Sequence, residues 1–327
     1  MSRRHIALSV HHQRPEAVAA ACDFIAGIHG HGITCWLRAP AFDVVHARIG
    51  ELHDVREFTG RPGRPVELVV VFGGDGTILR AAEWAVPEGY PLLGVNLGHV
   101  GFLAELEPSE RDTLVARVVD RDYRVEERLC LDVTLRDRPG GQVIWSSFAV
   151  NEVSLEKASR ERMIEVLVDI DGHPLSRWGT DGVLVATPTG STAYAFSAQG
   201  PVLWPDLDAL LVVPLLAHAL FARPLVLSPR STVAVTMLEG QSAGVLWCDG
   251  RRSTDVGSMQ EVTVGRSDLR LLLARTTEQP FVHRLVAKFD LPVHGWRGQA
   301  EREKLELLAR TRAAETHLRG SGTPDAD

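Results

Sequence analysis

Residues 66–77 read VELVVVFGGDGT, an apolar run that ends in three glycines, an aspartate and a threonine. Near-continuous apolar character over 66–72 is typical of a strand buried on both faces of a parallel sheet. The glycines allow a tight turn, and the helix expected over 77–86 presents free N–H groups at its start. The stretch therefore predicts a phosphate-binding loop at the carboxyl end of a parallel strand.

The amino-acid sequence of this loop does not match two common nucleotide-binding motifs. It is not GxGxxG, and it lacks the lysine of GxxxxGK[ST], so neither a dinucleotide-dependent dehydrogenase nor a P-loop enzyme is indicated. A plainer alternative is that Asp75 only caps the following helix, since aspartate is a good cap. A cap needs none of the flanking glycines, so the pattern favours a functional loop.

The first 125 residues alternate strand-like and helical patterns around this loop. Such alternation predicts a parallel sheet covered by helices, that is, an α/β domain over 1–125. The expected strands are 5–11, 33–37, 66–72 and 91–95, and the expected helices are 15–30, 77–86 and 108–120.

Beyond residue 125 the apolar residues alternate with a period of two, which is typical of antiparallel strands. Residues 126–279 therefore predict a β-rich domain. Its expected strands are 124–137, 143–150, 163–171, 183–187, 231–238, 244–248, 262–265 and 269–276. Residues 281–289 are helical in pattern, so 280–300 are expected to return to the α/β domain, and 301–327 form a charged, partly disordered tail.

Composition narrows the class of protein. The chain has 327 residues, 45% hydrophobic and 24% charged, with a net charge of −7, which argues against a dedicated nucleic-acid binder. The longest apolar stretch, 209–222, is too short to span a membrane. The N-terminus leads into a strand without a signal-peptide pattern, so a cytoplasmic location is expected. The four cysteines show no CxxC spacing, so neither a disulfide nor a zinc site is expected.

A second candidate loop, TPTGSTAY at 187–194, follows the apolar strand VLVAT. Its hydroxyls can hydrogen-bond a polar ligand and Tyr194 can stack on it, although an ordinary capped helix is the plainer alternative. Asn151 and Glu152 together can hold ribose hydroxyls, but the dipeptide alone carries little information. The Asp-Gly pairs at 171, 181 and 249 are expected to be turns.

These motifs together resemble one enzyme family. GGDGT at 73–77, NLGHVGFL at 96–103, NE at 151–152, TDG at 180–182 and TPTGSTAYAFSAQGPV at 187–202 resemble the ordered motifs of NAD kinases. The resemblance runs from about residue 66 to GWR at 295–297. GGDGT alone is shared with diacylglycerol-type lipid kinases and resembles the phosphate loop of phosphofructokinases, so TPTGSTAY carries the specificity.

The resemblance implies a reaction and a set of residues. The terminal phosphoryl group of ATP or polyphosphate would move to the 2′-hydroxyl of the adenosine ribose of NAD, with Asp75 as general base. Mg²⁺ or another divalent cation would arrive with the nucleotide, without dedicated metal ligands in the chain. The enzyme is implied to be a homodimer or homotetramer. The implied binding residues are Gly74, Gly76, Arg80, Asn151, Glu152, Arg162, Asp181, Thr192, Ala193, Tyr194, Ala195, Phe196, Ser197 and Arg251.

Two positions depart from the family pattern. Position 251 is Arg where many relatives have Gln, and position 179 is Gly where some relatives carry a long basic side chain beside Asp181. In relatives a small residue at 179 accompanies use of both NAD and NADH, which is therefore expected here. A lipid kinase is the enzymatic alternative, and a catalytically silent dinucleotide sensor is the other. The sequence leaves open the phosphoryl donor, the number of subunits, the role of the tail and feedback by NADPH.

Overall fold

The computed structural model describes residues 3–50, 54–60, 62–98, 101–104, 111–160, 162–240, 243–277 and 279–293. The chain divides into two compact units, Met1–Glu278 and Gln279–Asp327. In the second unit the helix predicted over 281–289 is confirmed as α6 (Phe281–Phe289). Its return to the α/β domain stays a prediction, and the tail 301–327 lies outside the described residues.

The first unit begins with a parallel α/β arrangement. Its parallel strands lie in the order β5-β4-β1-β2-β3. They are β1 (Arg4–Val10), β2 (Ile33–Leu37), β3 (Val55–Glu57), β4 (Leu68–Phe72) and β5 (Leu92–Val95). The connecting helices are α1 (Pro15–Gly27), α2 (Ala41–Ile49), α3 (Asp75–Ala85), a 3₁₀ turn η1 (Val86–Glu88) and α4 (Arg111–Asp120).

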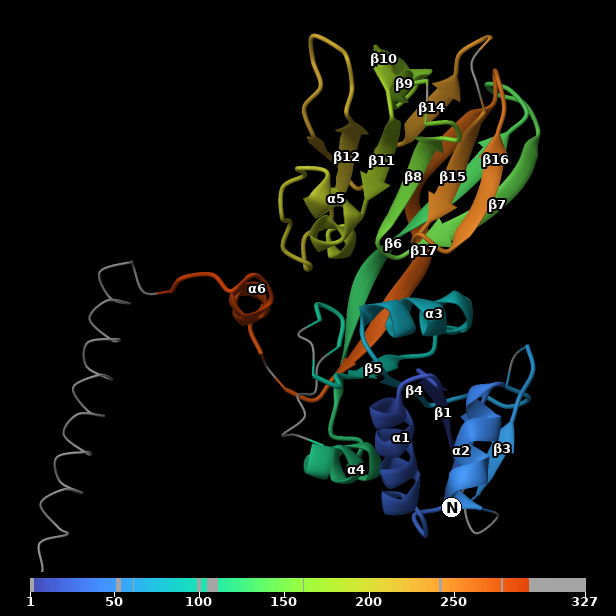
Figure 1. Ribbon diagram of the computed structural model, residues 1–327, viewed down its shortest axis with the longest axis vertical. Coiled ribbons are helices and arrows are strands. Elements are labelled where there is room, and N and C mark those ends of the chain that lie inside the picture. The colour runs from blue at the N-terminus through green and yellow to red at the C-terminus, as the bar shows by residue number, and fades with distance from the viewer. Residues whose placement is uncertain are drawn as a thin grey trace, which may run out of the picture. The chain divides into compact units, whose positions relative to one another are not determined.

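Both faces of this sheet are covered, as the apolar run in β4 predicted. Leu68 and Val70 pack with residues of α1 and α4, whereas Val69 and Val71 pack with residues of α3. Successive side chains of a strand point to opposite faces, so each apolar residue of β4 meets a helix on one side or the other. The carboxyl end of β4 then leads directly into α3 (Figure 1).

Two long antiparallel strands carry the sheet into the β-rich half. β6 (Arg124–Arg136) and β17 (Glu261–Arg275) pair along nearly their whole length. At one end β17 also pairs parallel to β5 through Leu273 and Leu92, and at the other it pairs with β14. Figure 1 shows both strands running from the parallel half into the β-rich half. One continuous sheet therefore joins the two halves.

The β-rich half is completed by a second sheet. Strands β7 (Val143–Ala149), β9 (Ile164–Ile170), β10 (His173–Thr180) and β14 (Val233–Met237) extend the first sheet. The second has the order β13-β12-β11-β8-β15-β16, formed by β8 (Glu152–Lys157), β11 (Gly182–Ala186), β12 (Leu210–Leu215), β13 (Leu225–Leu227), β15 (Gly244–Cys248) and β16 (Arg252–Val256). A shared apolar core contains side chains from both sheets, among them Leu131, Val166 and Leu155.

The predicted fold class, an α/β part followed by a β-rich part, is confirmed. Several local features differ from the expectations. Residues 261–275 form one strand with an irregular register between Arg266 and Arg270, where two strands were expected. Glu152 begins β8, a strand that its mixed sequence EVSLEK did not signal. The ordinary capped helix that was the alternative at TPTGSTAY is instead the 3₁₀ turn η3 (Thr189–Thr192) followed by the short α5 (Tyr194–Ser197). No helix in the described part of the chain is long and apolar enough to cross a membrane.

Candidate active site

Asp75 is the first residue of α3, and its carboxylate faces a neighbouring loop. The helix is capped by Gly74 without a side-chain hydrogen bond, so the alternative that Asp75 only caps the helix is wrong. Instead Oδ2 accepts the backbone N–H of Phe102 at 3.0 Å. Oδ1 accepts those of Leu103 at 3.1 Å and Ala104 at 3.4 Å. The end of the NLGHVGFL motif thus orients the Asp75 carboxylate.

Gly101 makes this contact possible. A Cβ at position 101 would lie 2.4 Å from Oδ1 of Asp75, closer than any real contact, so a side chain there would displace the carboxylate. Residues 99 and 100 of the motif lie outside the described residues. The two glycine-rich segments, at 73–76 and at 101, therefore meet around one carboxylate.

A second group of residues forms where the TPTGST loop packs on Asn151. The Thr187 N–H donates to the Asn151 carbonyl at 2.9 Å. The Thr187 hydroxyl donates to the Val150 carbonyl at 2.7 Å and accepts the Gly190 N–H at 3.0 Å. The TPTGST loop and the Asn-Glu pair, which were separate candidates in the sequence, therefore pack together in the fold.

Replacing Gly190 by alanine tests this packing. The added Cβ would lie 1.9 Å from the Asn151 carbonyl oxygen, so the loop must move away from the Asn-Glu pair. We expect a loss of about 1–3 kcal/mol or more in the free energy of unfolding, and a melting temperature lower by several degrees. Gly63→Ala, where nothing lies within 4 Å, is the control in thermal unfolding. Equal melting temperatures for the two variants would contradict the packing described here.

The Glu152 side chain is buried next to this loop. Its exposed fraction is 8%, and Oε2 has no hydrogen-bond partner among the described residues. Burial raises the pKa of Glu152 to about 8, and the nearby Asp249 carboxylate adds to the rise, while a hydrogen bond from the Tyr194 backbone opposes it. A buried carboxyl oxygen without a partner is costly unless a ligand pairs with it.

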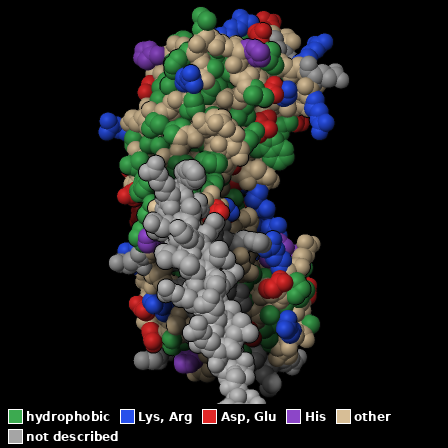
Figure 2. Space-filling view, turned by 60° about the vertical axis from the view of Figure 1, so that its left-hand side comes forward, with side chains coloured by type: hydrophobic (Ala, Val, Ile, Leu, Met, Phe, Trp, Pro, Cys, Tyr) green, Lys and Arg blue, Asp and Glu red, His purple; other side chains and the backbone are tan. Residues whose placement is uncertain are grey.

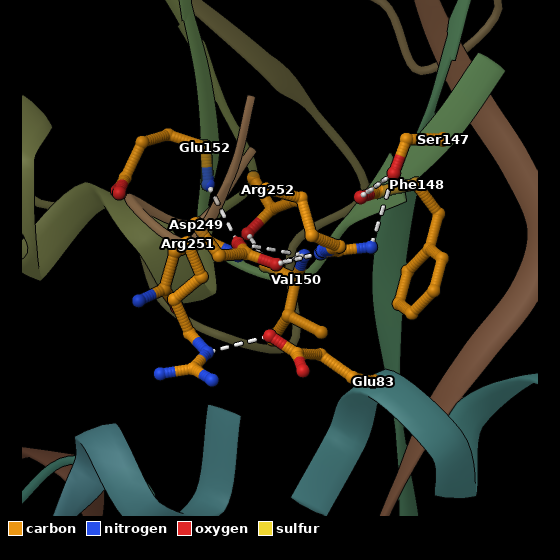
Figure 3. Close-up of polar contacts among 10 residues, drawn as sticks. Glu83, Ser147, Phe148, Val150, Glu152, Asp249, Arg251 and Arg252 are labelled. Atoms are coloured by element: carbon orange, nitrogen blue, oxygen red, sulfur yellow. Dashed lines mark hydrogen bonds and ion pairs between the residues drawn. The ribbon is translucent and has the colours of Figure 1, made fainter. Parts of the chain in front are cut away.

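Asp249 lies in the turn between β15 and β16, close to Glu152 (Figure 3). Its carboxylate accepts the backbone N–H groups of Val150 at 3.0 Å and Asn151 at 2.7 Å, with a longer contact to Glu152 at 3.4 Å. It also forms an ion pair of 2.8 Å with Arg252. The Arg252 guanidinium lies over the Phe148 ring, 4.3 Å from its centroid.

Three of the predicted site residues, Asp181, Tyr194 and Ser197, line a cavity of about 430 Å³. Its wall also includes Lys157 of β8, whose Nζ lies 2.7 Å from Oδ1 of Asp181. The cavity therefore contains an ion pair and the phenol ring of Tyr194, whose residue is 39% exposed. These groups can contact a polar, planar ligand.

The other predicted residues have varied environments. Gly76, Phe196 and Arg162 are exposed, while Gly74, Thr192 and Ala193 are half-buried. Ala195 is fully buried among core side chains, so its methyl group packs rather than lines a cavity. Arg80 is exposed on α3 and borders a small pocket at the carboxyl ends of β1 and β2. Arg251 forms an ion pair of 2.5 Å with Glu83 of α3.

Comparison with known proteins assigns this arrangement to a family. The family model of the ATP-NAD kinase N-terminal domain matches residues 41–123, and that of the C-terminal domain matches residues 150–276. The chain belongs to the NAD kinase family. The NAD kinase of Cutibacterium acnes is 53% identical over 306 residues, 93% of this chain and 95% of that protein. The NAD kinase of Thermobifida fusca is 48% identical over 305 residues, covering 91% and 93% of the two chains.

Solved structures agree on the fold of this NAD kinase. A yeast NADH kinase complexed with NADH matches with a TM-score of 0.79 and 22% identity over 90% of this chain and 89% of that one. An NAD kinase from Archaeoglobus fulgidus in complex with ATP matches with a TM-score of 0.63 and 23% identity, covering 88% and 98% of the two chains. The identity of about half to curated NAD kinases over most of the chain makes it an NAD kinase enzyme, and the lipid kinase alternative is set aside.

Several residues around the NAD kinase site were not expected from the sequence. Lys157 and Glu83 gave no signal, because an isolated charge on a strand or helix usually faces solvent. Asp249 was expected to form a turn, which it does, but its burial against Asn151 could not be read from an Asp-Gly pair. Within the described segments, no three side chains of His, Cys, Asp or Glu come together as a metal site.

Proposed function

We propose that the enzyme transfers the terminal phosphoryl group of ATP to the 2′-hydroxyl of the adenosine ribose of NAD. The observation that carries this proposal is the buried Glu152 carboxyl, which has an unpaired oxygen beside the TPTGST loop. A ribose hydroxyl both donates and accepts hydrogen bonds, so it can pair with that oxygen in either protonation state of Glu152. The amide of Asn151 supplies a further donor and acceptor.

Asp75 is proposed as the general base. A sugar hydroxyl becomes a good nucleophile only when its proton is accepted during attack. A carboxylate has about four lone-pair sites, and the three backbone N–H groups at Asp75 leave Oδ2 with a single donor. Oδ2 therefore retains capacity to accept the proton of the ribose hydroxyl.

A divalent cation is proposed to enter with the donor phosphates rather than to reside in the protein. Mg²⁺ binds well through phosphate oxygens and few protein carboxylates, and it offsets the charge of the transferring group. The free N–H groups at the start of α3, next to Gly74 and Gly76, are proposed to face these phosphates. Polyphosphate would use the same groups, because it presents the same oxygen chemistry.

The direct test is ATP-dependent formation of NADP by the purified chain with Mg²⁺. Parallel reactions with polyphosphate as donor, and with NADH as acceptor, define the finer specificity. If the chain binds NAD but none of these reactions gives a phosphorylated product, it is the catalytically silent sensor instead.

Replacing Gly179 by arginine tests the proposed use of both NAD and NADH. A Cβ at 179 would meet only the Met163 methyl group at 4.0 Å, so β10 can hold a long side chain there. We expect the wild type to phosphorylate both dinucleotides, and the variant to lose about tenfold in kcat/KM for NADH relative to NAD. The added side chain fills the space beside Asp181, where the family resemblance places the nicotinamide end, and the puckered ring of NADH fits that narrowed space less well than the planar ring of NAD.

His173→Arg is the matched control, because it adds the same side chain at the other end of β10. If the wild type already discriminates against NADH as strongly as the Gly179 variant, position 179 does not set the choice.

We also propose that the enzyme is a homo-oligomer. Figure 2 shows hydrophobic side chains gathered on the β-rich half of the face in view. Exposed apolar patches of this kind are typical of subunit contacts. The exposed large apolar residues of this half include Trp204, Leu207, Leu216, Leu220, Phe221 and Val226. Sedimentation equilibrium measures the number of subunits directly, and a strictly monomeric enzyme at assay concentration would refute the proposal.

A further inference from the structure

The turn between β15 and β16 contacts two parts of the site that are far apart in sequence. Asp249 holds the backbone of residues 150–152, as described above. Arg251, two residues after Asp249 in the same turn, forms an ion pair with Glu83 on α3. Since α3 begins at Asp75, one short turn contacts both the proposed base-bearing helix and the proposed ribose-binding pair (Figure 3).

The first contact is built like a structural anchor. The Asp249 residue is 7% exposed, and its carboxylate accepts backbone N–H groups while pairing with Arg252. Asp249 and Gly250 both adopt positive φ, 54° and 61°, so the carboxylate is fixed by a tight turn. Arg252 is held in turn by Ser147 at 3.1 Å and by the Phe148 ring. The anchor therefore fixes the backbone at residues 150–152, and with it the direction in which the side chains of Asn151 and Glu152 point.

The second contact is more exposed. The Arg251 and Glu83 side chains are 30% and 29% exposed, so their ion pair adds little to overall stability. The contact of 2.5 Å nevertheless links the turn to α3 at Glu83, eight residues after Asp75. A displacement of about 1 Å between catalytic groups can cost roughly a hundredfold in rate, so a weak tie can matter more for catalysis than for stability.

We propose that the Asp249–Arg252 turn is a positioning element of the active site, in which Asp249 orients Asn151 and Glu152 and Arg251 orients α3. The turn acts through these residues and does not itself contact the reacting atoms. The inference rests on the proposed placement of the ribose at Asn151 and Glu152. It also gives Arg251 a role other than the dinucleotide contact that the family resemblance implied.

Asp249→Asn is the principal test. The amide keeps the size of the side chain and can keep an oxygen at the Oδ1 position, but its NH₂ group then faces the Val150 N–H and the Arg252 guanidinium, which Oδ2 accepts at 3.0 and 2.8 Å in the wild type. These donors lose Oδ2 as their acceptor, so the segment that begins at Val150 and includes Asn151 and Glu152 must shift. We expect kcat/KM for NAD to fall by about tenfold to a hundredfold, mainly through a higher KM.

A pH profile measures whether the Asp249 charge acts on Glu152. Burial is the main cause of the raised pKa of Glu152, and the Asp249 and Glu156 charges add to it, while the Tyr194 N–H lowers the pKa and Arg252 faces Asp249. Removing the charge at 249 therefore lowers the pKa of Glu152, and the pH dependence of KM for NAD should move to lower pH. This movement follows from the lost charge alone, whereas partial unfolding would lower kcat and leave KM unchanged, so the higher KM is the measurement that reports positioning.

Asp171→Asn is the matched control. Asp171 and Gly172 also form a turn with positive φ, 54° and 78°, between β9 and β10. The Asp171 carboxylate likewise accepts a backbone N–H, from Thr232 at 2.8 Å, and the Ser231 hydroxyl at 3.0 Å. Asp171 is exposed and has no contact with Asn151 or Glu152 among the described residues. We expect its variant to keep the wild-type kcat/KM.

The Arg251–Glu83 pair gives a test that does not depend on Asp249→Asn folding. Arg251→Ala and Glu83→Ala should each lower kcat severalfold with little change in melting temperature, and the double variant should be no worse than either single one. Additive effects, or wild-type kcat in both single variants, would overturn the role of Arg251. Asp249→Asn behaving like Asp171→Asn would overturn the role of Asp249. If the wild type itself forms no NADP, the proposed function fails rather than the inference.

Discussion

Replacing Asp75 by asparagine is expected to lower kcat by on the order of a hundredfold or more while NAD still binds. The amide has nearly the same size but cannot accept the proton of the ribose hydroxyl. General base catalysis by a positioned side chain commonly contributes this much to the rate. Steady-state kinetics with NAD and ATP, combined with calorimetric titration of NAD, separate the loss of turnover from a loss of binding.

The structure adds a secondary effect to this prediction. Both oxygens of Asp75 accept backbone N–H groups, so the NH₂ of asparagine must face at least one of these donors. An unpaired donor costs about 1–3 kcal/mol, and the melting temperature should fall by a few degrees. Assays must therefore be run well below the melting temperature of the variant. Turnover close to that of the wild type would show that Asp75 is not the base.

Glu152→Gln is expected to remove a pH dependence of stability. The pKa of Glu152 is about 8 in the folded protein and near 4.5 when the chain is unfolded. The folded state thus holds the proton more tightly, and the free energy of unfolding falls as the pH rises from about 4.5 to about 8. Each pKa unit corresponds to about 1.4 kcal/mol, so the full change is on the order of a few kcal/mol.

Urea denaturation of wild type and variant at pH 5, 6.5 and 8 measures this difference. The wild type should lose stability relative to the glutamine variant across the series, because only the wild type must ionise a buried carboxyl. Bound NAD should reduce the difference if the dinucleotide pairs with the free oxygen of Glu152. Parallel stability curves for the two proteins would mean that Glu152 does not titrate in this range.

The strand-loop-helix at 66–85 could be predicted because its sequence satisfies several independent requirements at once. The apolar run fits a doubly covered strand, and the glycines fit a turn where Asp75 must approach another loop. The residues that contact Asp75 were harder to predict from the sequence. The motif at 96–103 was recognised by resemblance, but the backbone N–H groups of residues 102–104 that orient the carboxylate carry no side-chain signature.

The motifs of the proposed dinucleotide site could be read from the sequence, but the residues that support them could not. The TPTGST loop and Asn151 do meet, because both follow or begin strands of the same sheet. Lys157, by contrast, lies five residues beyond Glu152 in a strand whose charged residues obscured the strand pattern. Its partner Asp181 comes from between two other strands, and only the pairing of β8 with β11 brings the two together.

The junction of β17 with β5 has a consequence for how the chain is made. β5 ends at Val95, yet its parallel partner β17 begins at Glu261 and meets it through Leu273. At ribosomal rates of about 5–20 residues per second, the edge of the nascent parallel sheet waits roughly ten to thirty seconds for that strand. An unpaired strand edge of this kind can pair with other chains. Chaperone demand during synthesis should therefore peak before residue 275 has left the ribosome, and truncated messages that stop earlier should give aggregated product.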